Sequence, residues 1–234
     1  MEFLLQFLDS PLFGITLTIG ALVLFQVLFK NVKNPLLNPL IFAIIGIIAF
    51  LKLTGIPYES YAKGGDIIAF LLGPVTVAFA VPLYKQFDKL KANALPILIG
   101  ITSGALVAIV STVGLGLIFK LSNKMIISLS PKSTTTAIAM ELSRILGGDP
   151  ALTVAFVVFA GTLGFMFGEP IFKLLKIENK TARGIALGTA SHAFGTNRAL
   201  LMGEEEGAMS SLAIGVAGVM TTFLLPPILK FFGL

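Results

Sequence analysis

Residues 182–202 read ARGIALGTASHAFGTNRALLM, with an apolar stretch on each side of a polar middle. A helix needs about 20 apolar residues to cross a bilayer core of roughly 30 Å. This stretch is long enough, but its middle holds His192, the only histidine of the chain, and Arg198 follows. Irregular backbone survives at membrane depth only where protein or a wet cavity covers it. The stretch therefore predicts a broken helix or a re-entrant hairpin.

A second stretch, residues 125–146, repeats this pattern as MIISLSPKSTTTAIAMELSRIL. Ser130 is a favoured residue before a helix, and Pro131 is favoured at the first helical position. The pattern predicts a half-helix that begins here, with Lys132 in its first turn. We expect both polar segments, 121–147 and 174–205, to be broken or re-entrant.

The rest of the chain is apolar enough to lie in lipid. It is 56% hydrophobic and 12% charged, with a mean hydropathy of +0.95. This composition predicts an all-α, multi-pass membrane bundle forming one domain over residues 1–234. We expect it in the cytoplasmic (inner) membrane of the cell. Six long spans are expected, over residues 11–29, 36–53, 66–84, 94–119, 151–172 and 208–231.

Several classes of function are disfavoured by the composition. The absence of cysteine excludes disulfides and thiol chemistry, and a lone histidine does not make a usual zinc or haem site, so no metal or cofactor is expected. The net charge of +5 does not suggest nucleic acid and suits basic loops near anionic lipid. The first residues, MEFLLQFLDSPLFG, lack a basic n-region, so we expect mature sequence and no signal peptide.

Two further features concern the spans themselves. Gly73 and Pro74 interrupt the third stretch and predict a helix break there. Residues 149–173 align without a gap to residues 206–230. This predicts internal repeats as in many transporters, each with an interrupted segment followed by a long helix. The alternative is that any two small-residue-rich spans with a basic end resemble each other.

The two polar interruptions share a pattern that suits an anion. In GTNRA (195–199) Gly195 allows a break, Thr196 is a candidate cap and Arg198 follows two residues later, as Lys132 follows Ser130. Two half-helix starts with one cation each would bind a small carboxylate without a metal. The alternative is that Lys132 and Arg198 extend to the membrane surface. The expected solute-binding residues are Ser130, Lys132, Ser133, Thr134, Thr135, Thr136, Ser191, His192, Gly195, Thr196 and Arg198.

The remaining charged residues have structural interpretations beside functional ones. His192 is either a proton-coupling group or a neutral hydrogen-bonded strut. Glu204, Glu205 and Glu206 precede the last long helix and complement its dipole, and Asp149 precedes the helix at 151. Glu204 and Glu206 are also candidates for coupling or gating. Glu141 and Arg144 are expected to pair. No nucleophile and base are placed together, so we do not expect an enzyme.

These motifs resemble the LrgB family of membrane proteins, historically called antiholin-like, which includes the membrane part of the plastid glycolate/glycerate transporter. The blocks P-K-S-x-T-T and S-H-x-x-G-T are the most specific. Ala137 departs from the pattern, since the family has a proline there. The matching stretches are 71–86, 130–143, 147–158, 182–200 and 203–213.

The resemblance implies transport of small monocarboxylates such as pyruvate, glycolate or glycerate. It also implies, for bacterial members, action with a small holin-like LrgA/CidA partner in the control of murein hydrolases and cell lysis. We expect a homodimer working by alternating access. The family's motif residues fall on Pro131, Lys132, Ser133, Thr135, Thr136, Ser191, His192, Gly195, Thr196, Glu204 and Glu206.

Overall fold

The computed structural model describes every residue except 1, 31–38, 72–73, 75–76, 78–79 and 86. Every element assigned within this described part of the chain is a helix, as expected. The chain divides into two compact units, Met1–Ala78 and Phe79–Leu234. The expectation of a single domain stays a prediction.

The first unit contains four helices: α1 (Glu2–Asp9), α2 (Pro11–Leu28), α3 (Pro39–Thr54) and α4 (Tyr58–Phe70). Pro11 begins α2 because proline lacks the N–H that a first helical residue leaves unpaired. Helices α2 and α4 cross closely at two glycines, where a Cβ on Gly14 would lie 2.9 Å from the Gly64 Cα. Small residues at a crossing are typical of helix pairs in membranes.

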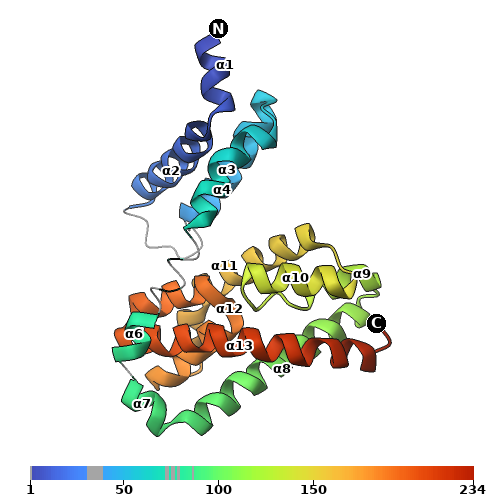
Figure 1. Ribbon diagram of the computed structural model, residues 1–234. Helices are drawn as coiled ribbons and strands as arrows, with labels where there is room; N and C mark the ends of the chain where they lie inside the picture. The colour runs from blue at the N-terminus through green and yellow to red at the C-terminus, as the bar shows by residue number, and fades with distance from the viewer. Residues whose placement is uncertain (1, 31–38, 72–73, 75–76, 78–79, 86) are drawn as a thin grey trace. The chain divides into compact units, whose positions relative to one another are not determined.

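The second unit contains the other helices (Figure 1). They are α6 (Ala80–Lys85), α7 (Phe87–Ala92), α8 (Ala94–Ile118), α9 (Asn123–Leu129), α10 (Thr136–Leu146), α11 (Pro150–Leu174), α12 (Lys180–Met202) and α13 (Glu204–Phe231). Helix α13 packs against α6, α8, α10 and α12, and runs the length of the unit in Figure 1.

Within the described residues, four helices are long and apolar enough to cross a membrane, namely α2, α8, α11 and α13. They match four of the six expected spans. The span expected at 36–53 is a shorter apolar helix, α3. The span expected at 66–84 includes α6 and the end of α4, and the break expected at Gly73 and Pro74 lies largely outside the described residues. The count of six spans therefore stays a prediction.

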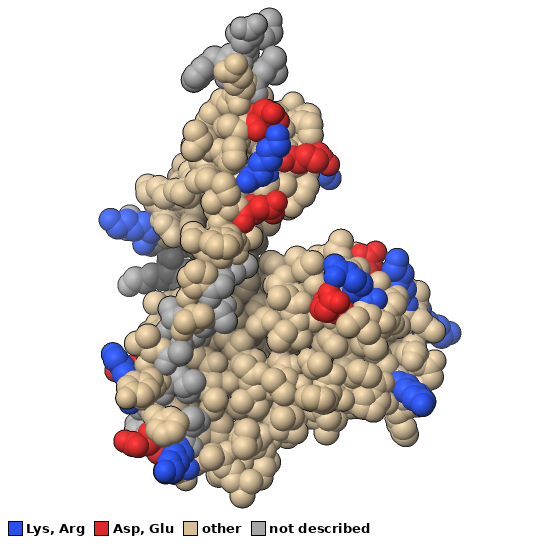
Figure 2. Space-filling view, viewed as in Figure 1, with Lys and Arg blue, Asp and Glu red and all other residues tan. Residues whose placement is uncertain are grey.

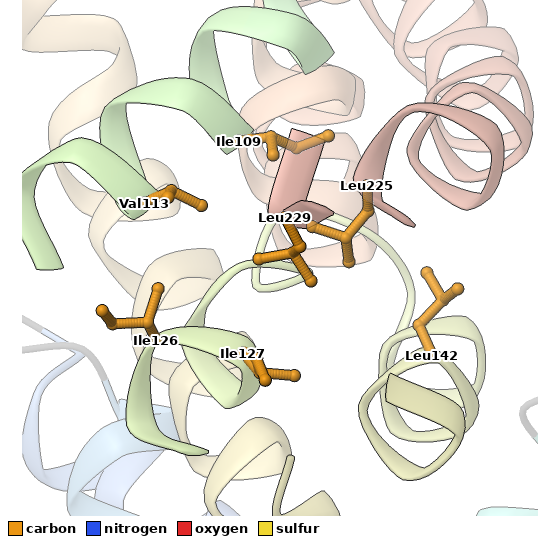
Figure 3. Packing of buried hydrophobic residues seen from close by; sticks show 7 residues of the cluster. All are labelled: Ile109, Val113, Ile126, Ile127, Leu142, Leu225 and Leu229. Atoms are coloured by element: carbon orange, nitrogen blue, oxygen red, sulfur yellow. The ribbon is translucent and has the colours of Figure 1, made fainter. Parts of the chain in front are cut away.

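A buried apolar cluster joins four helices at one end of the second unit (Figure 3). Ile109 and Val113 of α8, like the other buried residues of that helix, recur every three or four positions, so they form one face. The other members come from α9, α10 and α13. They are Ile126, Ile127, Leu142, Leu225 and Leu229.

Candidate functional site

The first polar segment forms two short helices joined by a turn. Ser122 caps α9 by accepting the Met125 N–H at 3.3 Å. Ser130 ends α9, and its hydroxyl donates to the Ile126 carbonyl at 2.7 Å. Thr135 then caps α10 by accepting the Ile138 N–H, so Thr136 is the first residue of that helix. We call residues 123–146 the first hairpin.

The expected helix start at Ser130 and Pro131 is therefore wrong by five residues. The Ser130 hydroxyl is bonded back into α9 and is not free to cap a following helix. Lys132 and Ser133 lie in the turn and not in a first helical turn.

Hydrogen bonds with the start of α11 bring the two arms of the first hairpin together. The Asp149 N–H donates to the Ser128 hydroxyl at 2.7 Å. The Thr153 hydroxyl lies 3.0 Å from the Ser128 carbonyl and 2.7 Å from the Ser143 hydroxyl. Because Ser128 is in α9 and Ser143 in α10, the segment turns back on itself.

The second polar segment, α12, also reverses direction, and we call residues 180–202 the second hairpin. Its break lies at Ser191 and His192, whose φ values of −137° and 42° are not helical. Leu187 and Ala199 belong to one buried cluster, although 12 residues of straight helix would separate them by about 18 Å. A Cβ on Gly195 would overlap the Leu187 carbonyl, so the two arms are in close contact.

The break was expected at His192–Thr196, and the structure places it at the first of these residues. Gly195 is needed for the close contact of the arms and not for the break. Thr196 is fully buried inside the second arm, and its hydroxyl shares a 2.7 Å hydrogen bond with the Ser210 hydroxyl of α13. It does not cap a helix, so this part of the prediction is wrong.

His192 fastens the second hairpin to α11. Its Nε2–H donates to the Val157 carbonyl at 3.0 Å, and its ring packs edge-on against Phe194. The side chain is buried, and a Cβ on Gly161 would lie 2.7 Å from the ring. His192 was expected to be either a proton-coupling group or a hydrogen-bonded strut, and this geometry fits the strut. The hydrogen bond also helps to hold a positive φ that residues with a Cβ rarely adopt.

The two hairpins approach α13 from opposite ends. The base of the second hairpin lies at the start of α13, because a Cβ on Gly184 would overlap the Glu206 carbonyl. Thr196, close to its break, meets Ser210. A Cβ on Gly218 would lie 3.3 Å from the Thr134 hydroxyl in the turn of the first hairpin. The two breaks therefore contact α13 about eight residues, or about 12 Å, apart.

Each hairpin is followed by a long helix, α11 or α13, as the expected repeats require. The duplication itself stays a prediction.

A cavity of about 940 Å³ lies beside α8, the turn of the first hairpin and the first arm of α12. We call it the Lys132 cavity. Lys132 and Ser133 come from the first break, and Thr189 and Ala190 directly precede the second. Apolar residues, including Ile97, Val107 and Ile185, form much of the rest.

The polar groups of this cavity have unused hydrogen-bonding capacity. Lys132 is half-buried and makes no ion pair with any carboxylate among the described residues. Thr189 is 5% exposed, and its hydroxyl is buried and, within the described part of the chain, has no hydrogen-bond partner. Thr189 was not among the expected site residues, since a single threonine inside an apolar arm gives no signal in the sequence.

Arg198 does not line this cavity. It forms an ion pair with Glu169 of α11, which also pairs with Lys173 at 2.8 Å. These residues line a second cavity. The two cations expected in one site are therefore apart, because the second arm carries Arg198 towards the end of α11. Glu169 was missed because it lies 29 residues before Arg198.

The three consecutive glutamates occupy the first turn of α13, as expected, and differ in their surroundings. Glu204 is exposed and pairs with Lys85 at 3.2 Å. Glu205 accepts from the Thr181 hydroxyl at 2.9 Å. Glu206 is only 3% exposed.

The other predicted pairs also form. Glu141 and Arg144 lie 2.6 Å apart, and the Asp149 carboxylate accepts the Ala151 and Leu152 N–H groups. The bond from Leu152, first among several contacts that include Lys124, lowers the pKa of Asp149 below its ordinary value.

Charged residues are sparse on the face of the second unit drawn in Figure 2. They gather towards its two sides, with a wide uncharged area between them. Among the residues that the structure describes, no group of three or more His, Asp or Glu side chains is arranged to hold a metal ion.

Comparisons with known proteins agree with the motifs. The model of the LrgB-like family matches residues 18–231. The chain is 39% identical over 225 residues to the antiholin-like protein LrgB of Bacillus subtilis (strain 168), covering 96% of this chain and 97% of that protein. It is 38% identical over 225 residues to the proteins of the same name from Bacillus mycoides (strain KBAB4) and Bacillus cereus (strain B4264), covering 96% of this chain and 98% of each.

No solved structure matches the chain. The family model and the relatives confirm the resemblance seen in the motifs. With its apolar helices, the chain is a multi-pass membrane protein and belongs to the LrgB-like family.

Proposed function

We propose that the chain binds a small carboxylate in the Lys132 cavity and moves it across the membrane by alternating access. The observation that carries this proposal is the half-buried Lys132, which has no carboxylate partner among the described residues and faces a cavity. An ionisable group inside a membrane segment is costly and tends to be functional. A bound carboxylate would supply the missing negative charge.

The rest of the cavity suits an organic acid. Ser133 lines the cavity beside the first break, and apolar side chains such as Ile97 would contact the carbon skeleton. Broken helices that meet inside a bundle are where secondary transporters bind their solutes. Pyruvate, glycolate and glycerate are the first solutes to test, with the cytoplasmic membrane as the location and a homodimer as the assembly.

Uptake into proteoliposomes tests this proposal. The purified protein should take up radiolabelled pyruvate or glycolate saturably, and Lys132→Gln should abolish this uptake while the protein remains folded. Lys230→Gln is the matched control because Lys230 is exposed and does not line the cavity. Unchanged uptake by Lys132→Gln would refute the anion site.

The alternative is an antiholin-like regulator of murein hydrolases and cell lysis that acts with a small holin-like LrgA/CidA partner. The names of the relatives favour this alternative over transport, since each is called antiholin-like protein LrgB. Cells lacking the native gene and expressing Lys132→Gln separate the two functions. Normal control of lysis without carboxylate flux would favour the regulator.

A further inference from the structure

The Lys132 cavity follows two helices that lie side by side. A Cβ on Gly100 of α8 would lie 3.9 Å from the side chain of Ile185 in α12. One turn further along, a Cβ on Gly104 would lie 3.0 Å from the side chain of Thr189. Because this step advances both helices by one turn, α8 and the first arm of α12 run in the same direction. The cavity that they line is therefore a groove along both helices.

The groove is long and large. Its lining on α8 runs from Asn93 to Ala108, which corresponds to about 22 Å of helix. Its volume of about 940 Å³ falls within the range of about 300–1,000 Å³ in which protein pockets enclose drug-sized ligands. A solute as small as pyruvate would fill only a small part of this volume. The groove therefore has room for a carboxylate with a longer carbon chain.

Lys132 lies at the inner end of the groove. The chain reverses after α8, since a Cβ on Gly116 would lie 2.8 Å from the Ile126 side chain of α9. Helix α9 therefore runs back along α8, and the turn after it reaches α8 near Ala108, the last α8 residue of the lining. On α12 the lining ends at Ala190, next to the break. The cation is thus placed beside both breaks.

The opposite end of the groove lies where both helices begin. Asn93 directly precedes α8, and the Asn179 side chain caps α12. Helix α8 is long and apolar enough to cross a membrane, so its start is expected near a membrane surface. The groove therefore extends from a polar entrance to a cation within the bundle.

Between these ends the wall of the groove is largely apolar. Ile97 and Ile185 contribute to it, and the Ser103 hydroxyl is already used, because it donates to the Gly100 carbonyl at 3.1 Å. Lys132 is the one charged side chain among the described residues that line the groove. A single carboxylate would pair with this cation, whereas a second carboxylate along the apolar wall would have no partner and would be destabilising.

We propose that the solute of this cavity is a monocarboxylate with an apolar carbon chain longer than that of pyruvate, such as butyrate, hexanoate or a branched 2-oxo acid. The carboxylate pairs with Lys132, and the chain lies along the groove towards Ile97 and Ile185. This inference rests on the proposed transport function and names the class of solute that the same site takes. Each CH₂ group that enters the groove strengthens binding about twofold to fourfold.

Equilibrium binding of radiolabelled hexanoate to the purified full chain in detergent tests the proposal, with protein-free micelles as the correction for partitioning. Unlabelled acetate, butyrate and hexanoate compete with the label, and their inhibition constants should fall about twofold to fourfold for each CH₂ group. Adipate carries a carboxylate in place of the terminal methyl group of hexanoate and should compete about tenfold more weakly or worse. Equal constants for the three monocarboxylates, or for adipate and hexanoate, would overturn the proposal.

A substitution within the groove locates the chain. The Cβ of Gly100→Leu meets Ile185 at an ordinary contact distance, and the rest of the leucine would occupy the groove. The ratio of the hexanoate and acetate affinities should fall about tenfold. Gly114→Leu is the matched control on the same helix, because Gly114 does not line the groove and its Cβ would meet no described atom within 4 Å. An unchanged ratio in Gly100→Leu would overturn the proposal.

Lys132→Gln separates this inference from the proposed function. It should weaken the binding of every monocarboxylate tenfold or more, about 1.4 kcal/mol, since all of them share the carboxylate. Hexanoate that binds Lys132→Gln as tightly as the wild type would overturn the inference. If pyruvate binding depends on Lys132 and chain length has no effect, this inference alone fails. If the wild type binds neither pyruvate nor hexanoate, the proposed function fails with it. The competition series uses the wild type and stands even if a variant does not fold.

Discussion

Each of the two hairpins places a polar break inside an apolar bundle, and the two breaks are stabilised in different ways. The first uses a turn of several residues between α9 and α10, with a threonine cap on the second helix. The second reverses between Ser191 and His192, with a positive φ held by a hydrogen bond to α11. The first hairpin is thus stabilised by hydrogen bonds with the start of α11, and the second by a hydrogen bond at its tip.

The cations of the two hairpins also differ in whether a carboxylate compensates them. Lys132 of the first hairpin has no carboxylate partner among the described residues, whereas Arg198 of the second is paired with Glu169. An uncompensated cation in a cavity can attract a solute, and a compensated one mainly positions the hairpin. Similar sequence patterns therefore do not imply similar roles.

The largest loss of stability is expected from a substitution at the tip of the second hairpin. A Cβ at position 164 would overlap the Ser191 hydroxyl, so Gly164→Ala should lower the free energy of unfolding by about 3 kcal/mol. In Gly215→Ala the new Cβ meets no described atom within 4 Å, and no loss is expected. Thermal unfolding in detergent compares the two variants. Equal midpoints would contradict the close packing of this tip.

The next largest loss of stability is expected where the start of α11 holds the first hairpin. Thr153 is fully buried, and its hydroxyl joins Ser128 and Ser143. Thr153→Val leaves these groups without their partner and should lower the free energy of unfolding by about 2 kcal/mol. Thr222→Val, at an exposed position of α13, should change it by less than about 0.5 kcal/mol. A smaller loss in Thr153→Val than in the control would contradict the proposed role of these hydrogen bonds.

The ion pair between Glu169 and Arg198 of the second hairpin should contribute less to the free energy of unfolding. A double-mutant cycle of Glu169→Gln and Arg198→Gln should give a coupling energy of about 1 kcal/mol, because both side chains are partly exposed. Unfolding of the four proteins in detergent measures it. A coupling energy of zero would mean that Glu169 does not compensate Arg198.

The smallest effect concerns Asp149, which caps α11. Because the pKa of this carboxyl is lowered by folding, its stabilisation is present above its ordinary pKa of 3.8 and is lost as the pH falls through the folded value. Asn also caps helices, so Asp149→Asn should remove only this pH dependence. Unfolding midpoints of both proteins between pH 3 and pH 7 should converge at the acidic end. A difference that grows towards low pH would contradict the assignment.

Local features could be predicted from the sequence, and contacts between distant segments could not. The four long helices, the broken nature of both polar segments, the cap at Asp149 and the Glu141–Arg144 pair follow from hydrophobicity and short-range chemistry. The cap at Thr135 was missed because Ser130 bonds to its own helix, a choice that several neighbouring hydroxyls leave open.

Three features of the candidate site depend on residues far apart in the chain. Arg198 is compensated by Glu169, and Thr189 and Lys132 line one cavity. Gly164 resembles any small residue in a membrane helix until Ser191 is placed against it. Such contacts depend on how the hairpins fold back, and periodicity along the chain does not reveal that.

Equilibrium binding of glycolate or pyruvate to purified variants tests the central claim most directly, since it compares the two cations. Lys132→Gln should lose binding by tenfold or more, about 1.4 kcal/mol, because its charge is uncompensated. The double variant Glu169→Gln/Arg198→Gln, in which the pair is removed together, should bind as the wild type does. Binding lost in the double variant and kept in Lys132→Gln would contradict the account.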